Sequence, residues 1–226
     1  MRVFRVPPAN APAAMSTGRL TPYASLQEAD YPALAKRILD GETILYPTET
    51  TYGLGCDARS EAGIRKIFEL KRRPEEKSLL CLVRDIPTLE TFAEIPARLL
   101  PFIGKYWPGP LTLIVPAKPG KLPLEILSAG QSDIAVRISS HPFCRKLLAH
   151  LPAPLVSTSA NFSGEKAPSS FEAVPAPIRE KVGIAIDAGS IAGGGIPSTI
   201  VKIDARTGKP VLVREGAVPA KALGLG

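Results

Sequence analysis

The sequence lacks long apolar runs, closely spaced cysteines and histidine clusters. No apolar run approaches the ~18 residues that a bilayer-spanning helix needs, so we expect no membrane association. The three cysteines, Cys56, Cys81 and Cys144, have neither disulfide-like nor zinc-like spacing and predict reduced thiols in a cytoplasmic protein. Two histidines exclude a multi-histidine metal site, and no carboxylate cluster forms a metal cage, so we expect no metal ligands from the protein.

Familiar catalytic signatures are also missing. The chain contains no G-x-x-x-x-G-K-[ST] phosphate loop, no G-x-G-x-x-G fingerprint and no G-x-S-x-G elbow. Chemistry by positioning and charge stabilisation therefore fits better than covalent catalysis. Aromatic residues make up 6% of the chain and are scattered, so nothing resembles the stacking platforms of many RNA-binding proteins.

Positive charge is the main global hint about ligands. The formal net charge is +7, and the segment Arg59–Lys77 alone has seven basic and four acidic residues. Such a bias suits nucleic acid or a small ligand rich in phosphate. A solvated basic helix face is the simpler alternative.

The pattern of elements predicts one α/β domain with a twisted, mixed or mostly parallel sheet and flanking helices. We expect a loose Pro/Ala-rich extension at 1–22, a domain at 23–217 and a short tail at 218–226. Ser60 is a candidate N-cap of a helix that ends before Pro74. Helices are also predicted near 30–40, 98–106 and 142–148, and strands at 44–45, 79–83, 111–115, 134–138, 155–156, 183–186, 199–203 and 211–213.

Polar groups follow three of the predicted strands. The first set is a hydroxyl-rich loop that begins after Pro47 and continues through Gly53 and Gly55. The other two sets are the cations around Pro74 and the hydroxyls and amide of 157–163. Because open α/β sheets bind ligands beyond the strand ends, we expect these loops to converge on one site.

Five motifs in order resemble the YrdC-like threonylcarbamoyl-AMP synthase family, in its single-domain form. They are YPTETTYGLG at 46–55, KRRP at 71–74, WPGPLT at 107–112, STSANFSG at 157–164 and PSTI at 197–200. The resemblance runs from about Leu34 to about Gly216. Longer members carry a second domain, whereas this sequence ends at Gly226.

The resemblance implies an α/β fold with a large, basic, concave cavity and a defined reaction. L-threonine, bicarbonate and ATP would give threonylcarbamoyl-adenylate and pyrophosphate, with Mg²⁺ carried on the phosphates. The product would supply the threonylcarbamoyl group for N6-threonylcarbamoyladenosine in tRNA through a downstream transfer machinery. A basic cavity also implies weak, salt-sensitive tRNA binding.

Site residues are carried over from the resemblance position by position. The catalytic set matches Lys71, Arg73, Ser159 and Asn161; the ATP set matches Arg73, Lys77, Asn161, Ser169, Ser198 and Arg214; the threonine set matches Thr50, Arg137 and Ser159. Some members have a histidine where this chain has Leu82, which removes or replaces one threonine contact. Two alternatives stay open: a sister YrdC-like protein with different carbamoyl or adenylate chemistry, and an RNA-binding module.

Overall fold

The computed structural model describes residues 2–5, 20–22, 26–192 and 194–225. The strands are β1 (Arg2–Arg5), β2 (Leu20–Pro22), β3 (Ile44–Pro47), β4 (Tyr52–Gly55), β5 (Leu80–Leu82), β6 (Leu111–Pro116), β7 (Asp133–Arg137), β8 (Leu155–Ser159), β9 (Ile184–Asp187), β10 (Thr199–Ile203) and β11 (Pro210–Arg214). The helices are α1 (Asp30–Leu39), α2 (Glu61–Lys71), α3 (Ile86–Glu90), η2 (Ala97–Leu99), α4 (Leu100–Tyr106), α5 (Leu124–Leu127), α6 (Pro142–Leu148), α7 (Ala176–Lys181) and α8 (Ala220–Leu223).

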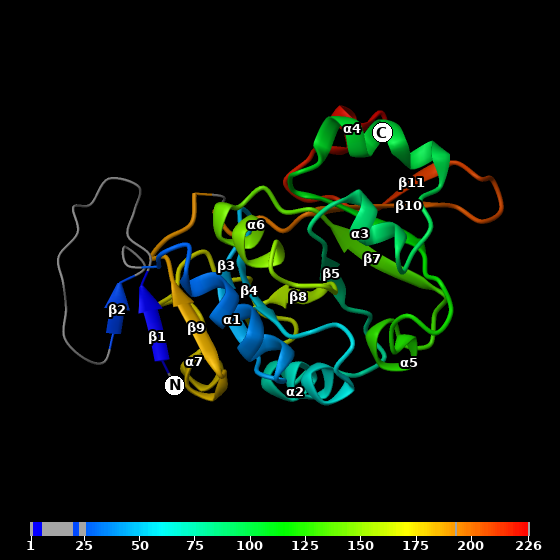
Figure 1. Cartoon of the computed structure of the whole chain (residues 1–226). Helices are drawn as coiled ribbons and strands as arrows, with labels where there is room; N and C mark the ends of the chain where they lie inside the picture. Colours follow the sequence, from blue (N-terminus) through cyan, green and yellow to red (C-terminus); the bar gives the residue numbers. More distant parts are fainter. Residues whose placement is uncertain (1, 6–19, 23–25, 193, 226) are drawn as a thin grey trace.

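One twisted sheet organises the molecule (Figure 1). Its strand order is β11-β10-β6-β7-β5-β8-β4-β3-β9-β1-β2. The sheet contains parallel pairs such as β5 with β7 and antiparallel pairs such as β6 with β7, so it is mixed, as predicted. Within the described ranges, no helix is both long and apolar enough to cross a bilayer.

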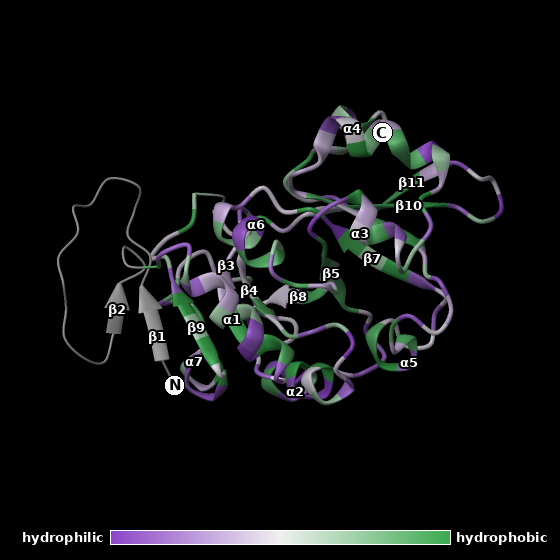
Figure 2. Cartoon of the chain, in the orientation of Figure 1, coloured by the Kyte–Doolittle hydropathy of each residue, from purple (hydrophilic) through white to green (hydrophobic). Residues whose placement is uncertain are grey.

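Alternate strand residues face opposite sides of the sheet, and each side has its own core. On one side, Leu54, Cys81 and Val136 pack with the buried faces of α2, α5 and α7. On the other side, α1 and α6 pack together over β3 and β9, in a cluster that includes Ile44 and Ile184. Figure 2 shows the hydrophobic colour along β9 that this burial requires.

Local signals place the helix ends close to the predicted positions. The Ser60 side chain accepts a hydrogen bond from Gly63 N at the start of α2, as its predicted capping role requires. At the other end of α2, Arg72 has φ 49°, and Pro74 follows. The chain therefore leaves the helix in the loop that carries Arg73.

The predicted loop of the first motif is wrong in its second half. The Thr48 hydroxyl accepts hydrogen bonds from the backbone N–H groups of Thr50 and Thr51, both at 3.1 Å, and the chain reverses there. The strand β4 then pairs antiparallel with β3, so that Tyr46 lies opposite Gly53. The glycines therefore belong to a buried strand that lies beside the Tyr46 ring.

The described parts of both terminal segments pair or pack with the domain. Residues 2–5 form β1, which pairs parallel with β9, and residues 20–22 form β2 beside it. A loose extension is therefore wrong for these seven residues, because their backbones add strands to the sheet edge. The remainder of that prediction, residues 1 and 6–19, lies outside the described residues. In the tail, Val218 and Leu223 are buried in the main core.

Gly55 leaves no space for a side chain. A Cβ atom there would lie 2.2 Å from the Val156 carbonyl oxygen on β8. We expect Gly55→Ala to lower the free energy of unfolding by about 3 kcal/mol, because strand backbone rather than a flexible side chain must move. In the control Gly104→Ala, the added Cβ meets nothing within 4 Å, and helix propensity favours alanine. Denaturant titration of both variants checks this; a stable Gly55→Ala protein would contradict it.

Candidate functional site

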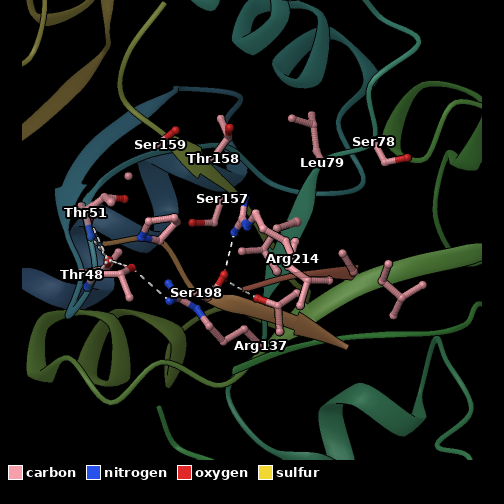
Figure 3. A pocket seen from close by; sticks show the side chains of 18 of the residues that line it. Thr48, Thr51, Ser78, Leu79, Arg137, Ser157, Thr158, Ser159, Ser198 and Arg214 are labelled. Carbon is pink, nitrogen blue, oxygen red and sulfur yellow. Dashed lines mark hydrogen bonds between the residues drawn. The ribbon is translucent and has the colours of Figure 1, made fainter. Parts of the chain in front are cut away.

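A cavity of about 280 Å³ lies on the sheet face that α1 and α6 leave uncovered (Figure 3). The strand register explains its lining, since paired residues on adjacent strands point to the same side. The paired rows are Gly53 with Ser159; Ser157, Leu80, Ala135 and Ile114; and Thr112, Ile200 and Arg214. Its volume lies near the lower end of the ~300–1,000 Å³ typical of small-molecule sites, although the resemblance implied a large cavity.

Hydroxyl groups line one end of the cavity, where β3 turns into β4. The Thr48 and Thr50 hydroxyls lie 2.9 Å apart, and the Thr48 hydroxyl donates to the Thr51 carbonyl at 2.7 Å. On the strands, the hydroxyls of Thr112 and Ser198 lie 2.8 Å apart. These short side chains are already oriented by one another, so they present fixed polar atoms to a ligand.

Three arginines line the same cavity: Arg73, Arg137 and Arg214. Arg137 is 2% exposed at the end of β7, and its Nη1 donates to the Thr50 hydroxyl at 3.1 Å. Arg214 donates to the Ser198 carbonyl at 2.7 Å (Figure 3). Loss of hydration and the charge of Arg137 lower the pKa of Arg214. Arg73, half-buried after α2, donates to the Ser78 carbonyl at 2.8 Å.

No carboxylate lies among the described residues that line the cavity. Glu49, outside the lining, places its Oε1 3.6 Å from Arg137 Nη1. Guanidinium groups bind carboxylate and phosphate with two parallel hydrogen bonds. Among the described residues, no group of His, Cys, Asp or Glu is arranged to hold a metal ion. The arrangement is that of a site for an anionic ligand.

Lys71 lies behind the cavity rather than in its lining. Its side chain is 1% exposed, and its Nζ donates to the Asn161 carbonyl at 2.8 Å and to the Ser159 carbonyl. Burial and the neighbouring Arg73 charge lower the pKa of Lys71 to about 7. Lys71 therefore ties the end of α2 to the loop that follows β8.

This pKa shift gives the Lys71 contribution to stability a definite pH dependence. The ordinary lysine value is 10.5, so between about pH 7 and 10.5 the unfolded chain holds a proton that the folded protein has lost. The free energy of unfolding attributable to Lys71 should therefore rise with pH over this window.

Denaturant unfolding of the wild type and of Lys71→Met at about pH 7 and about pH 9.5 checks this expectation. The free energy of unfolding of the wild type, relative to that of Lys71→Met, should be higher at about pH 9.5 than at about pH 7. Lys77→Met serves as control, because Lys77 is exposed. An identical difference between wild type and Lys71→Met at both pH values would contradict it.

Four of the predicted site residues are outside the cavity lining. They are Lys71, Lys77, Asn161 and Ser169, whereas Thr50, Arg73, Arg137, Ser159, Ser198 and Arg214 line it. Asn161 is buried, and its amide nitrogen donates to the carbonyls of Phe162 and Glu165, both at 2.8 Å. Its Oδ1 is buried and has no hydrogen-bond partner within the described part of the chain.

Sequence reasoning gave no role to several residues that line the cavity. Thr112 lies within a quoted motif, and Ala135 and Ile114 lie within correctly predicted strands. The signal that finds them is alternation: Leu113 and Val136 point into the core, so their neighbours point the opposite way. Strand order was also needed, because alternation alone does not say which strands are adjacent.

The fold and cavity define an α/β protein with a small-molecule site for anionic groups, built on an open face of a mixed sheet. A family model, Sua5/YciO/YrdC, whose description is "telomere recombination", matches residues 36–216. The chain belongs to this family, as the five motifs predicted.

Named relatives are similar over most of the chain. A threonylcarbamoyl-AMP synthase of Pyrococcus abyssi is 35% identical over 187 residues, which cover 82% of this chain and 54% of that protein. A putative threonylcarbamoyl-AMP synthase of Methanocaldococcus jannaschii is 36% identical over 190 residues, covering 84% of this chain and 87% of that protein. The chain thus spans about half the length of the first and most of the second.

A solved structure shares the fold. The crystal structure of P. abyssi Sua5 complexed with L-threonine matches with a TM-score of 0.82 and 29% identity, over 100% of this chain and 61% of that one.

Proposed function

We propose that the chain is a threonylcarbamoyl-AMP synthase, with residues 23–217 as the catalytic domain. The observation that carries the proposal is the convergence of three arginines and a set of hydroxyls in one cavity without a carboxylate in its lining. Family membership, the names of the relatives and the threonine complex of P. abyssi Sua5 support it. The anionic groups would be the phosphates of ATP and the carboxylate of L-threonine.

The reaction needs positioning and charge stabilisation, which the site can supply. The threonine amine would condense with bicarbonate to give a carbamate and water. A carbamate oxygen would then attack the α-phosphorus of ATP, forming threonylcarbamoyl-adenylate as the bond to pyrophosphate breaks. Negative charge grows on the leaving pyrophosphate, and Arg73 and Arg214 are fixed donors suited to stabilise it.

Individual roles follow the resemblance, adjusted to the geometry. ATP would contact Arg73, Lys77, Asn161, Ser169, Ser198 and Arg214; threonine would contact Arg137, Thr50 and Ser159. Because Lys71 bonds backbone carbonyls, we assign it a positioning role: it fixes the Ser159–Asn161 segment against α2. The buried Oδ1 of Asn161, which has no partner within the described ranges, is an acceptor that a nucleotide amino group could satisfy after a small rearrangement.

Mg²⁺ would be carried on the phosphates, because the cavity lining has no carboxylate to bind it, and no step above depends on it. The adenylate would pass to a tRNA threonylcarbamoyl-transfer machinery in the cytoplasm. Weak tRNA binding to basic surfaces would fall steeply with salt.

Pyrophosphate release distinguishes the candidate functions. For a synthase, release from ATP requires threonine and bicarbonate together. Serine should be weaker rather than inactive, because one methyl group is worth only ~1–3 kcal/mol of discrimination. Release that ignores threonine would favour a sister protein with other carbamoyl or adenylate chemistry. No ATP turnover, together with salt-sensitive tRNA binding, would favour an RNA-binding module.

A further inference from the structure

Among the described residues, the hydrogen bond and the ion pair of the Arg137 guanidinium both involve its Nη1. Its Nη1 donates to the Thr50 hydroxyl at 3.1 Å and lies 3.6 Å from Glu49 Oε1. Its Nε is buried and has no hydrogen-bond partner among the described residues. A buried guanidinium donor without an acceptor is costly, so a ligand oxygen that reached this edge after a small rearrangement would satisfy it.

Glu49 is itself fixed by the segment that follows β7. The Ser139 hydroxyl donates to Glu49 Oε2, and Ser140 N donates to Oε1 at 3.4 Å. The Ser139 hydroxyl in turn accepts from His141 N at 3.2 Å, at the start of α6. The carboxylate is thus held by the same chain segment that carries Arg137, and its side chain is only 16% exposed.

We propose that Glu49 is a positioning residue for Arg137. Together with Thr50 it holds the Nη1 side of the guanidinium. The Nε edge, which has no acceptor among the described residues, then bonds the carboxylate of the amino-acid substrate after a small rearrangement. The substrate assignment rests on the proposed function, whereas the positioning does not. Glu49 reaches the reaction only through Arg137, because it is not among the residues that line the cavity.

A competing role for Glu49, as an internal occupant of the anion site, fits the contacts less well. The Oε1–Nη1 separation of 3.6 Å is longer than a hydrogen bond, and it involves the edge that Thr50 already occupies. A competing carboxylate would be expected to bond the Nε, which has no hydrogen-bond partner in the part of the chain that the structure describes. The Glu49 oxygens are instead engaged by Ser139 and Ser140.

A substrate-free measurement tests the positioning directly. The Nε–H resonance of Arg137, assigned by its loss in Arg137→Lys, should be sharp in ¹⁵N-labelled wild type because the group is buried. In Glu49→Gln, which keeps the shape and the acceptor for Ser139, the resonance should broaden or shift as the guanidinium gains freedom. The control is Glu172→Gln, which removes another carboxylate paired with a partly buried arginine, Arg179, at 2.9 Å. In Glu172→Gln, the Nε–H resonance of Arg137 should stay as in the wild type.

Kinetics then separate positioning from a general loss of structure. Glu49→Gln should raise KM for L-threonine about tenfold and leave kcat and KM for ATP within about twofold, while Glu172→Gln changes none of them. The proposal is overturned if Arg137 has no protected resonance in the wild type, if Glu49→Gln leaves it unchanged, or if both substrates are affected equally. If the wild type does not use threonine, the proposed function fails, and the resonance still decides whether Glu49 positions Arg137.

Discussion

Arg73→Ala is expected to lower the rate of pyrophosphate release about a hundredfold while the fold survives. Arg73 follows the end of α2, and within the described part of the chain its side chain hydrogen-bonds to the backbone carbonyls of Lys77 and Ser78 rather than to core side chains. Burial lowers the pKa of Arg73, but an arginine remains charged at neutral pH. Losing a charged donor that acts mainly in the transition state costs ~3 kcal/mol, which accounts for the size of the effect.

The matched control for this variant is the neighbouring arginine. Arg72→Ala removes the same charge from the same loop, yet Arg72 stacks over the Phe162 ring, 4.4 Å from its centroid, and does not line the cavity. Steady-state pyrophosphate release and thermal unfolding should be measured for both variants. Equal activity losses in both would indicate a general charge effect and would remove Arg73 from the proposed chemistry.

Arg137→Lys should raise KM for threonine about thirtyfold, with little change in KM for ATP. Lysine keeps the charge but loses the planar fork that binds a carboxylate through two hydrogen bonds. Losing one charge-assisted hydrogen bond costs ~1.5–3 kcal/mol, which brackets this effect. Arg137→Ala should be worse, because it also leaves the largely buried Glu49 without its cation.

Arg179→Lys is the control for this substitution. It changes another arginine that has a glutamate partner and a buried Nε for which the described residues supply no acceptor. Threonine KM measured at saturating ATP should stay at the wild-type value. If Arg137→Lys also binds threonine normally, the carboxylate does not bind at Arg137.

Local chemistry explains why much of the fold could be predicted from the sequence. The N-cap at Ser60 and the stop before Pro74 depend on neighbours in the chain, and the structure has α2 between them. The strand β10 has the predicted bounds for the same reason: its β-branched run is bounded by turn residues on both sides.

The errors arose where distant contacts decide the structure. The glycines of β4 look like loop residues because their partners, the Tyr46 ring and the Val156 carbonyl, are supplied by two other strands. Likewise β1 needs the edge of β9, which no local pattern reveals. The short helices α5 and α7 were also missed, since four and six residues give too little periodicity to detect.

In the candidate site, too, some features could be predicted from the sequence and others depend on distant contacts. The family resemblance identified the three arginines that line the cavity, of which Arg73 lies in the KRRP motif. The sequence could not tell that Lys71, in that motif, turns away to bond the carbonyls of Ser159 and Asn161. The position of the Lys71 side chain depends on tertiary contacts, because the backbone carbonyls that accept from its Nζ belong to a distant part of the chain. The roles of Glu49 and Thr50 towards Arg137 likewise depend on contacts between residues far apart in the chain.

Identification of the product tests the proposed synthase activity most directly. The protein would be incubated with ATP, L-threonine and ¹³C-bicarbonate, and the adenylates analysed by mass spectrometry alongside pyrophosphate. We expect one adenylate that contains threonine and a single ¹³C atom, formed in equal amount to pyrophosphate and absent when either co-substrate is omitted. An adenylate without threonine or without the label, or pyrophosphate formed with AMP alone, would contradict the proposed activity.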